Sequence, residues 1–210
     1  MTRTAPAKDK SRVALPRRFA RALLPRQFRH ELATWWFEVF LIRRFPDRCY
    51  IERELLPASA RRGGELLFVG CRRYTRRYPA LLEMHGARCW TIDVDPSVAR
   101  WGAPGRHKIG AIQEARHLWP AASFETIIMH GVFGYGLDAA EDQADALLAC
   151  HTLMKPGGWL ILGWQTDLSA EPLAMRVIRA HFQQVTGWRK TFSPVVIDVF
   201  SRVDPMDGQG

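Results

Sequence analysis

The sequence has few cysteines, and their spacing does not suit a metal site. It holds four cysteines in 210 residues, and no two of them form a C-x-x-C pair. Structural zinc sites are usually built from such closely spaced pairs, so no metal ligands are expected. Scattered thiols are typical of a reducing compartment, and we therefore expect a cytoplasmic protein with free cysteines. The four are Cys49, Cys71, Cys89 and Cys150.

A long apolar run is missing as well. The best candidate, from Ala33 to Ile42, is too short to span a bilayer and carries Glu38. The start of the sequence lacks the apolar core and small-residue cleavage site of a secretory signal, so none is expected. With 47% hydrophobic and 24% charged residues, the composition is that of a folded globular protein.

The positive charge is concentrated near the beginning of the chain. Residues 1–48 have a formal charge of +8, out of a total of +9, and carry aromatic side chains at helical spacing. We expect this extension to be a partly disordered basic tail followed by amphipathic helices that form a cap over the domain. There are two alternatives: the extension contacts an anionic membrane surface, or it is an organellar transit peptide. Nucleic acid is not an expected partner.

From residue 65 onward, strand and helix patterns alternate. This alternation predicts an α/β domain over residues 49–210, with a mostly parallel central sheet and helices on both of its faces. The expected strands are Leu66–Val69, Cys89–Asp93, Lys108–Ile112, Phe124–His130, Trp159–Gly163 and Val195–Val203. The expected helices are Thr75–His85, Pro96–Trp101, Ala139–Met154 and Glu171–Phe182, with residues 155–158 as a turn.

Four residues stand at the carboxyl ends of expected strands: Gly70, Asp93, Ile112 and His130. Ligands of parallel sheets bind outside these ends, where the strand order reverses. Glycine lets a ligand approach the backbone closely, and an acid one strand later accepts hydrogen bonds from ribose hydroxyls. Gly70 and Asp93 are separated by one helix-sized segment, so they predict a nucleotide-type ligand.

Four blocks in this order resemble the class I S-adenosylmethionine-dependent methyltransferases, over roughly residues 65–165. Each block alone is short, and their order and spacing carry the resemblance to this Rossmann-like family. The blocks are Leu66–Gly70, the acidic strand end Thr91–Pro96, the strand start Ser123–Ile128, and Leu153–Leu160, which is similar to the family's LKPGG turn.

The resemblance implies S-adenosyl-L-methionine as cofactor and gives roles to individual residues. Gly70 would let the backbone approach the methionine portion, and Asp93 would accept hydrogen bonds from both ribose hydroxyls. Val94 and Ile112 would cover the two faces of the adenine. His130 and Gly131 would border the sulfonium and the acceptor.

The glycine loop departs from the family pattern. It reads Gly70-Cys71-Arg72-Arg73-Tyr74, where the family usually has G-x-G-x-G. The resemblance then implies that Cys71 and Tyr74 belong to the cofactor site, with the side chains of Tyr74 and the neighbouring arginines in contact with the carboxylate of the cofactor. Crowded arginines in this loop also indicate an anionic ligand. After the third strand only Gln113 stands where the family offers an acid or amide to the adenine amine.

Methyl transfer from a sulfonium mainly requires alignment of nucleophile, methyl group and sulfur. His130 is the candidate general base because an unperturbed histidine titrates near neutral pH. The alternative is a histidine that only hydrogen-bonds a loop. The glycine-rich segment after it, residues 131–136, would place Phe133 and Tyr135 in an acceptor pocket.

These features predict a methyltransferase that acts on a small-molecule, sugar-linked or lipid-linked acceptor. The alternative is a catalytically inactive, methyltransferase-like binding or scaffold protein, which the missing glycines favour. A nucleic-acid methyltransferase is disfavoured, since the sequence has neither an Asn/Asp-Pro-Pro-aromatic motif nor a Pro-Cys nucleophile motif.

Overall fold

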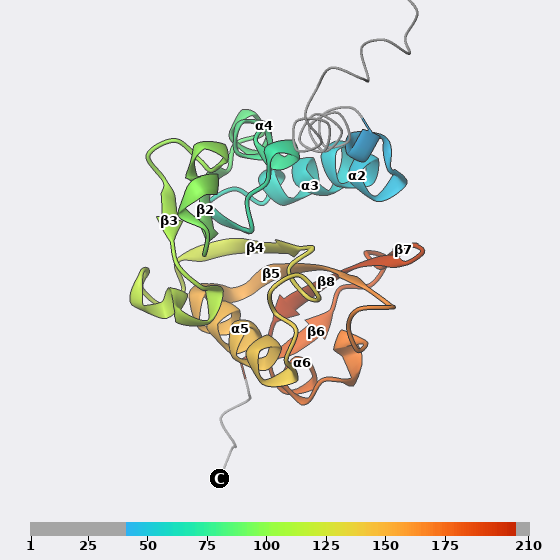
Figure 1. Cartoon of the computed structure of the whole chain (residues 1–210). Coiled ribbons are helices and arrows are strands. Elements are labelled where there is room, and N and C mark those ends of the chain that lie inside the picture. The colour runs from blue at the N-terminus through green and yellow to red at the C-terminus, as the bar shows by residue number, and fades with distance from the viewer. Residues whose placement is uncertain (1–40, 205–210) are drawn as a thin grey trace, which may run out of the picture.

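The computed structural model of the chain describes residues 41–204 (Figure 1). Most of the expected N-terminal extension, residues 1–40, lies outside this range. Its last residues are described, and Ile42–Arg44 forms a single 3₁₀ turn, η2. Within residues 41–204, no helix has both the length and the apolar character needed to cross a bilayer.

The described residues form an eight-stranded sheet in the order β3-β2-β1-β4-β5-β8-β6, with β7 paired to β8. Strands β1 to β5 are mutually parallel, and β8 is antiparallel to β5, β6 and β7. This confirms the expected mostly parallel sheet. The strands are β1 (Glu65–Val69), β2 (Arg88–Asp93), β3 (His107–Ile109), β4 (Phe124–His130), β5 (Met154–Gln165), β6 (Phe182–Gln184), β7 (Lys190–Phe192) and β8 (Val195–Arg202).

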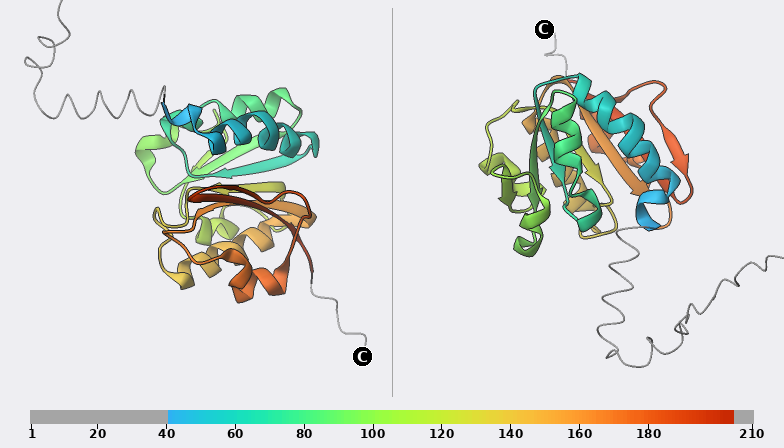
Figure 2. Two further views of the ribbon diagram at one scale, coloured as in Figure 1. Left: turned by 90° about the vertical axis from the view of Figure 1, so that its right-hand side faces the viewer. Right: turned by 90° about the horizontal axis from the view of Figure 1, so that it is seen from above.

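Helices cover both faces of this sheet, as the two views of Figure 2 show. The α-helices are α2 (Pro46–Tyr50), α3 (Leu56–Arg61), α4 (Tyr78–Met84), α5 (Ala140–Leu153) and α6 (Arg176–His181). The 3₁₀ segments are η4 (Arg73–Thr75), η5 (Pro96–Trp101), η6 (Ile112–His117) and η7 (Pro172–Ala174).

The alternation of side chains along each strand builds two separate cores. In β1, Leu66 and Phe68 pack under the layer of α2, α3 and α4, whereas Leu67 and Val69 face α5 and α6. All four are less than 5% exposed. A strand buried on both faces reads as a continuous apolar run, which is why the sequence locates it well.

One helical run was not predicted from the sequence. Residues 46–61 are helical throughout, as α2, a π-helical turn η3 (Ile51–Leu55) and α3. Pro57 lies inside the run and has no N–H to continue the α-helical bonding, so a departure from α geometry just before it is expected. The run continues across the expected division between residues 48 and 49.

The short strands β6 and β7 were not expected. The six expected strands match the observed ranges closely, with two differences. β5 begins at Met154, because Lys155 to Gly158 form a bulge against β4 rather than a separate turn. A side chain at Gly158 would meet two backbone oxygens, of Lys155 and Glu125, at 2.9 and 3.0 Å. The third strand ends at Ile109, so Ile112 begins the helical turn η6 instead of ending a strand.

The chain order sets the place where a ligand can bind. From β1 the chain moves outward to β2 and β3, then returns to place β4 on the other side of β1. The connections after β1 and β4 therefore leave in opposite directions. They open a crevice at the carboxyl ends of these two strands, which is where doubly wound sheets hold their ligands.

Candidate functional site

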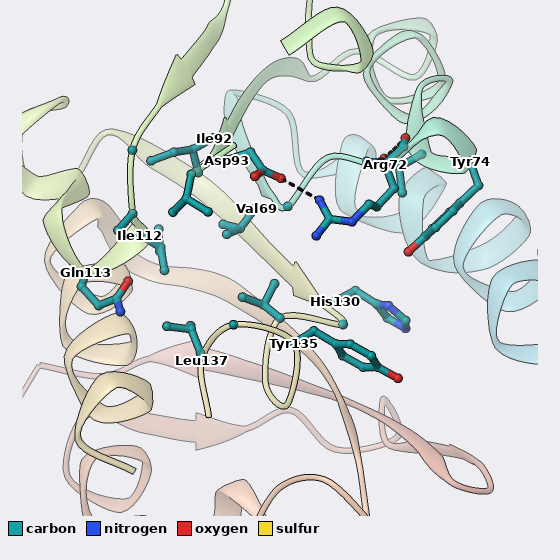
Figure 3. A pocket seen from close by; sticks show the side chains of 18 residues that line it. Val69, Arg72, Tyr74, Ile92, Asp93, Ile112, Gln113, His130, Tyr135 and Leu137 are labelled. Atoms are coloured by element: carbon teal, nitrogen blue, oxygen red, sulfur yellow. Dashed lines mark hydrogen bonds and ion pairs between the residues drawn. The ribbon is translucent and has the colours of Figure 1, made fainter. Parts of the chain in front are cut away.

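A cavity of about 320 Å³ lies in this crevice (Figure 3). Such a volume is at the lower end of the range of small-molecule sites, about 300–1,000 Å³. Nearly all the residues predicted to bind a cofactor line it, and Cys71 does not. The predicted residues in its wall are Gly70, Tyr74, Asp93, Val94, Ile112, Gln113, His130 and Gly131.

Gly70 ends β1 in a backbone conformation that favours glycine. Its φ is +84°, and its N–H donates to the carbonyl of Ile92 at 2.9 Å. A non-glycine residue at this φ would be strained. The turn exposes the loop backbone to the cavity, as the sequence analysis expected for this residue.

Asp93 ends β2 and is 6% exposed. Its Oδ2 accepts from the Cys71 N–H at 2.6 Å and lies 3.2 Å from Nη1 of Arg72. Its Oδ1 accepts from the Asp95 N–H at 2.9 Å. The carboxylate is thus fixed by two backbone donors and covered on the cavity side by the guanidinium of Arg72 (Figure 3).

Cys71 contributes to the site through its backbone. Its side chain is 1% exposed, and Sγ lies 4.0 Å from Nδ1 of His107, away from the cavity. Burial, together with the nearby Asp93 carboxylate, raises the pKa of the Cys71 thiol to about 12. The thiol therefore stays protonated at neutral pH, and its backbone N–H orients Asp93.

The far end of the cavity is an apolar slot. Ile112 is buried at the start of η6, Val94 is 66% exposed at the rim, and Gln113 brings the one side-chain amide in the wall of this cavity. The other apolar members are Val69, Ile92, Val132 and Leu137. Figure 3 shows Ile112, Gln113 and Leu137 on the side opposite His130 and Tyr135.

A second cavity of about 600 Å³ adjoins the first. It extends from the ends of β4 and β5 to helix α2 and to the segment between β7 and β8. Five residues line both cavities: Arg72, Tyr74, His130, Gly131 and Tyr135. Tyr135, expected in an acceptor pocket, lines both cavities, whereas Phe133, expected beside it, is fully buried in the core.

His130 is held in a way that argues against the predicted role as general base. Nη1 of Arg48 lies 3.0 Å from its Nδ1, and since a guanidinium only donates, Nδ1 must accept. Burial, with the charge of Arg48 adding to it, keeps the pKa of His130 well below its ordinary value of 6.5. The neutral ring then carries its proton on Nε2, and the one acceptor nitrogen is already used.

Asp47 and Arg48 are the site residues that the sequence analysis missed. Oδ2 of Asp47 lies 3.4 Å from Nε of Arg48 and 3.9 Å from Nε2 of His130, so adjacent residues of α2 face both ring nitrogens. The Pro46 at the start of α2 is a helix-start signal that could have revealed the helix. The contact between Arg48 and His130, which lie 82 residues apart, has no signal in the sequence.

The ring of His130 also packs directly on β5. A Cβ on Gly163 would lie 2.2 Å from Cδ2 of His130, so only glycine fits at this point of the strand. Arg48 further places its guanidinium 4.8 Å from the centroid of the Tyr74 ring, a cation–π distance. These contacts make His130 the point at which α2, β4 and β5 meet beside the two cavities.

Comparison with solved structures shows which known fold this architecture resembles. One match is the N-methyltransferase NodS of Bradyrhizobium japonicum WM9 in complex with S-adenosyl-L-homocysteine, with a TM-score of 0.61 and 17% identity. The alignment covers 80% of this chain and 93% of NodS. The chain has the fold of a class I methyltransferase. A TehB-like S-adenosylmethionine-dependent methyltransferase from Corynebacterium glutamicum matches at TM-score 0.61 and 19% identity, covering 84% of this chain and 99% of that one.

The same fold is found in a third solved structure. A methyltransferase from Methanosarcina mazei has a TM-score of 0.54 at 13% identity, covering 72% of this chain and 98% of that one. No protein-family model and no curated protein sequence matches the chain. The fold implied by the four sequence blocks is thereby confirmed, and the reaction has to be argued from the site.

Proposed function

We propose that the protein is an S-adenosyl-L-methionine-dependent methyltransferase. The observation that carries this proposal is the position of Asp93, a buried carboxylate at the end of β2 beside a glycine turn and an apolar slot that line the same cavity. The methyltransferase fold and the S-adenosylhomocysteine bound to NodS support it.

The residues of the first cavity fit this cofactor in size and in chemistry. The apolar slot between Val94 and Ile112 suits a flat base, and the amide of Gln113 can pair with the edge of that base. Asp93 suits a ribose, since a carboxylate accepts from two neighbouring hydroxyls. The Gly70 turn gives the remaining aminocarboxylate portion access to backbone donors.

The chain's own residues align and shield the reaction. When bound, the cofactor supplies a methyl group already activated by its positively charged sulfur. Arg72, Tyr74 and Tyr135 surround the junction of the cavities, where the acceptor must meet that methyl group. Positioning alone can provide much of the rate of such a displacement. His130 holds α2 in place as one wall of the acceptor cavity.

Calorimetric titration of the full chain with S-adenosyl-L-homocysteine tests the proposal directly. We expect saturable binding with one site per chain, at micromolar concentrations typical of metabolite sites. S-adenosyl-L-methionine should bind at the same site and be displaced by S-adenosyl-L-homocysteine. Absence of heat with both compounds at millimolar concentration would refute the function.

A catalytically inactive binding or scaffold protein is the second candidate, and one contact favours it. The Arg72 guanidinium lies on the carboxylate that a ribose would need, at 3.2 Å. If that ion pair is permanent, the cavity cannot hold a cofactor in the expected way. The same titration separates the candidates, because an inactive homologue with a closed site binds neither compound.

The acceptor is proposed to be a small molecule, either free or linked to a sugar or a lipid, that enters the second cavity. We also propose that residues 1–48 contact anionic membrane surfaces. Their +8 charge supports this, and Leu41 and Phe45 are 48% and 44% exposed at the rim of the described domain.

Vesicle flotation tests this membrane contact. We expect the full chain to float with vesicles of phosphatidylglycerol and phosphatidylcholine, and to be released at high salt because the attraction is electrostatic. A chain that begins at residue 41 keeps the described domain and is the matched control, which we expect to stay in the bottom fraction. Equal recovery of both chains would exclude the extension as the contact.

A further inference from the structure

The junction of the two cavities is rich in hydrogen-bond donors. Arg72, Tyr74 and Tyr135 all line both cavities. The hydroxyl of Tyr135 accepts from Nε2 of Gln165 at 2.8 Å, so its own O–H is left to donate. An acceptor that reaches the junction therefore meets a guanidinium and two phenol hydroxyls.

The proton-accepting groups in the walls of the two cavities are already engaged. Among the described lining residues these groups are Asp47, Asp93 and His130, leaving the weakly acidic tyrosines aside. Asp47 pairs with Arg48, and Asp93 accepts from three donors. Nδ1 of His130 accepts from Arg48. A nucleophile that arrives as an anion suits this junction, because no proton has to be removed from it.

Cofactor binding would displace Arg72 from Asp93 and make it available to such an anion, and as it turns Arg72 also gives up its hydrogen bond to the carbonyl of Cys71, at 2.7 Å. A carboxylate has about four acceptor positions, and three of those on Asp93 are taken by Cys71, Asp95 and Arg72. Two ribose hydroxyls need two positions, so one of them replaces Arg72. The side chain of Arg72 is 46% exposed, in contrast to the 5% of Asp93, and can turn without disturbing the core.

The rest of the second cavity is largely apolar. Beyond the junction its wall is formed by the ends of β5 and β8, the start of α2 and the segment between β7 and β8. The apolar residues there are Ile42, Phe45, Pro46, Trp164, Phe192, Pro194 and Val195. An occupant with a charged end at the junction and a hydrocarbon body in this region fits the cavity at both ends.

We propose that the second cavity binds a carboxylic acid with an apolar body, and that Arg72 holds its carboxylate beside the methyl group to be transferred. This inference rests on the methyltransferase function proposed above. A carboxylate is ionised at neutral pH, so it is a nucleophile that needs no general base. One molecule then satisfies both parts of the cavity: its apolar body contacts the apolar wall, and its carboxylate meets the donors at the junction.

The reaction assigned to this arrangement is formation of a methyl ester. A carboxylate oxygen forms a bond to the methyl carbon while the bond between that carbon and the sulfonium sulfur breaks. The electron pair of the broken bond stays on sulfur and neutralises its charge, and the negative charge of the carboxylate is lost. No proton is released, whereas methylation of an alcohol, or of an amine that ends uncharged, releases one.

Binding to the full-length protein saturated with S-adenosyl-L-homocysteine provides the main test. The probes are 3-phenylpropanoate, 4-phenylbutanoate, hexanoate and octanoate, each compared with its own amide, which has the same body and no charge. We expect at least one acid to bind about 10- to 100-fold more tightly than its amide, as a charge-assisted hydrogen bond predicts. If none of the four acids binds more tightly than its amide, the inference is overturned.

The Arg72→Gln variant identifies the residue. We expect it to lose the preference for the acid while its affinity for the amide stays unchanged. Its affinity for S-adenosyl-L-homocysteine should stay the same or rise, since Asp93 loses a competing partner. A fall in that affinity would instead assign Arg72 to the carboxylate of the cofactor and overturn the inference. Arg76→Gln is the matched control, because Arg76 is an exposed arginine of the same segment that lines neither cavity.

Product analysis completes the test and separates it from the proposed function. With S-adenosyl-L-methionine and the preferred acid, we expect its methyl ester by mass spectrometry and no acidification of a weakly buffered solution. Binding of that acid without ester formation would overturn the inference while leaving the cofactor site intact. A wild-type chain that does not bind S-adenosyl-L-homocysteine would refute the proposed function, and this inference with it.

Discussion

Replacing Asp93 with alanine is expected to weaken S-adenosyl-L-homocysteine binding by about 100-fold or more. Each hydrogen bond to a charged acceptor contributes about 1.5–3 kcal/mol, and the ribose is proposed to make two of them. Asp93 also receives the backbone N–H groups of Cys71 and Asp95, so its removal loosens the loop that shapes the cavity. Both effects act in the same direction on affinity, which calorimetry measures.

The neighbouring Asp95 offers a matched control for this change. Asp95→Asn removes the same charge, but the carboxylate of Asp95 is exposed, binds Ser97 and lines neither cavity. We expect its affinity for S-adenosyl-L-homocysteine to remain within about twofold of the parent, because the carboxylate of Asp95 lies in water, where a single charge has a weak effect. An Asp93→Ala protein that binds as tightly as the parent would show that the ribose lies elsewhere.

The stability of the protein is expected to fall as the pH drops below about 6.5, in part because of His130. Burial and the charge of Arg48 keep the pKa of His130 well below 6.5 in the folded protein. The unfolded chain therefore binds a proton at this residue over a pH range in which the folded protein does not. Protonation then favours unfolding, by about 1.4 kcal/mol per pH unit between the two pKa values.

The His130→Asn variant isolates this contribution. Asparagine keeps a side-chain oxygen to accept from Arg48 but does not titrate. His107 and His151, whose pKa values are also lowered by burial, remain in both proteins and cancel in the comparison. Urea unfolding from pH 7.5 to 5 measures how the free energy of unfolding changes with pH. We expect this slope to be smaller in the variant by about 1.4 kcal/mol per pH unit, which is the contribution of one proton. Equal slopes would mean that His130 takes up its proton over the same pH range in the folded and in the unfolded protein, and would restore it as a candidate base.

The sequence by itself determined the fold class and the strand ends at which the proposed cofactor site lies. The runs before Gly70 and Asp93 are apolar because parallel strands are buried on both faces, and each run stops where the strand reaches the ligand. The ends of β1, β2 and β4 could therefore be located residue by residue. Gly70 and Asp93 lie in the cavity wall at two of these strand ends, and their part in cofactor binding stays a prediction.

Helix α2 and the interactions around His130 could not be read in the same way. Residues 46–61 are interrupted by Pro57 and lack a simple periodic pattern. Because residues 1–48 are basic, Asp47 and Arg48 were assigned to the N-terminal extension instead of the domain. The tertiary structure brings Arg48 to His130 across 82 residues. Burial of the ring keeps the pKa of His130 low, and the contact with Arg48 adds to this effect, so His130 is a neutral hydrogen-bond acceptor.

The Arg72–Asp93 ion pair shows the same division between sequence and structure. The sequence showed an arginine-rich loop beside a glycine and an acid 21 residues later, which indicates an anionic ligand but not where the guanidinium lies. Whether Arg72 points to solvent, to Asp93 or to a second cavity depends on how β1 and β2 are aligned and on what encloses the space beyond them. Periodicity and residue type record burial, which is a local property of the chain. Protonation states and the partners of charged groups depend on desolvation and on distances between remote segments, and those only the folded structure decides.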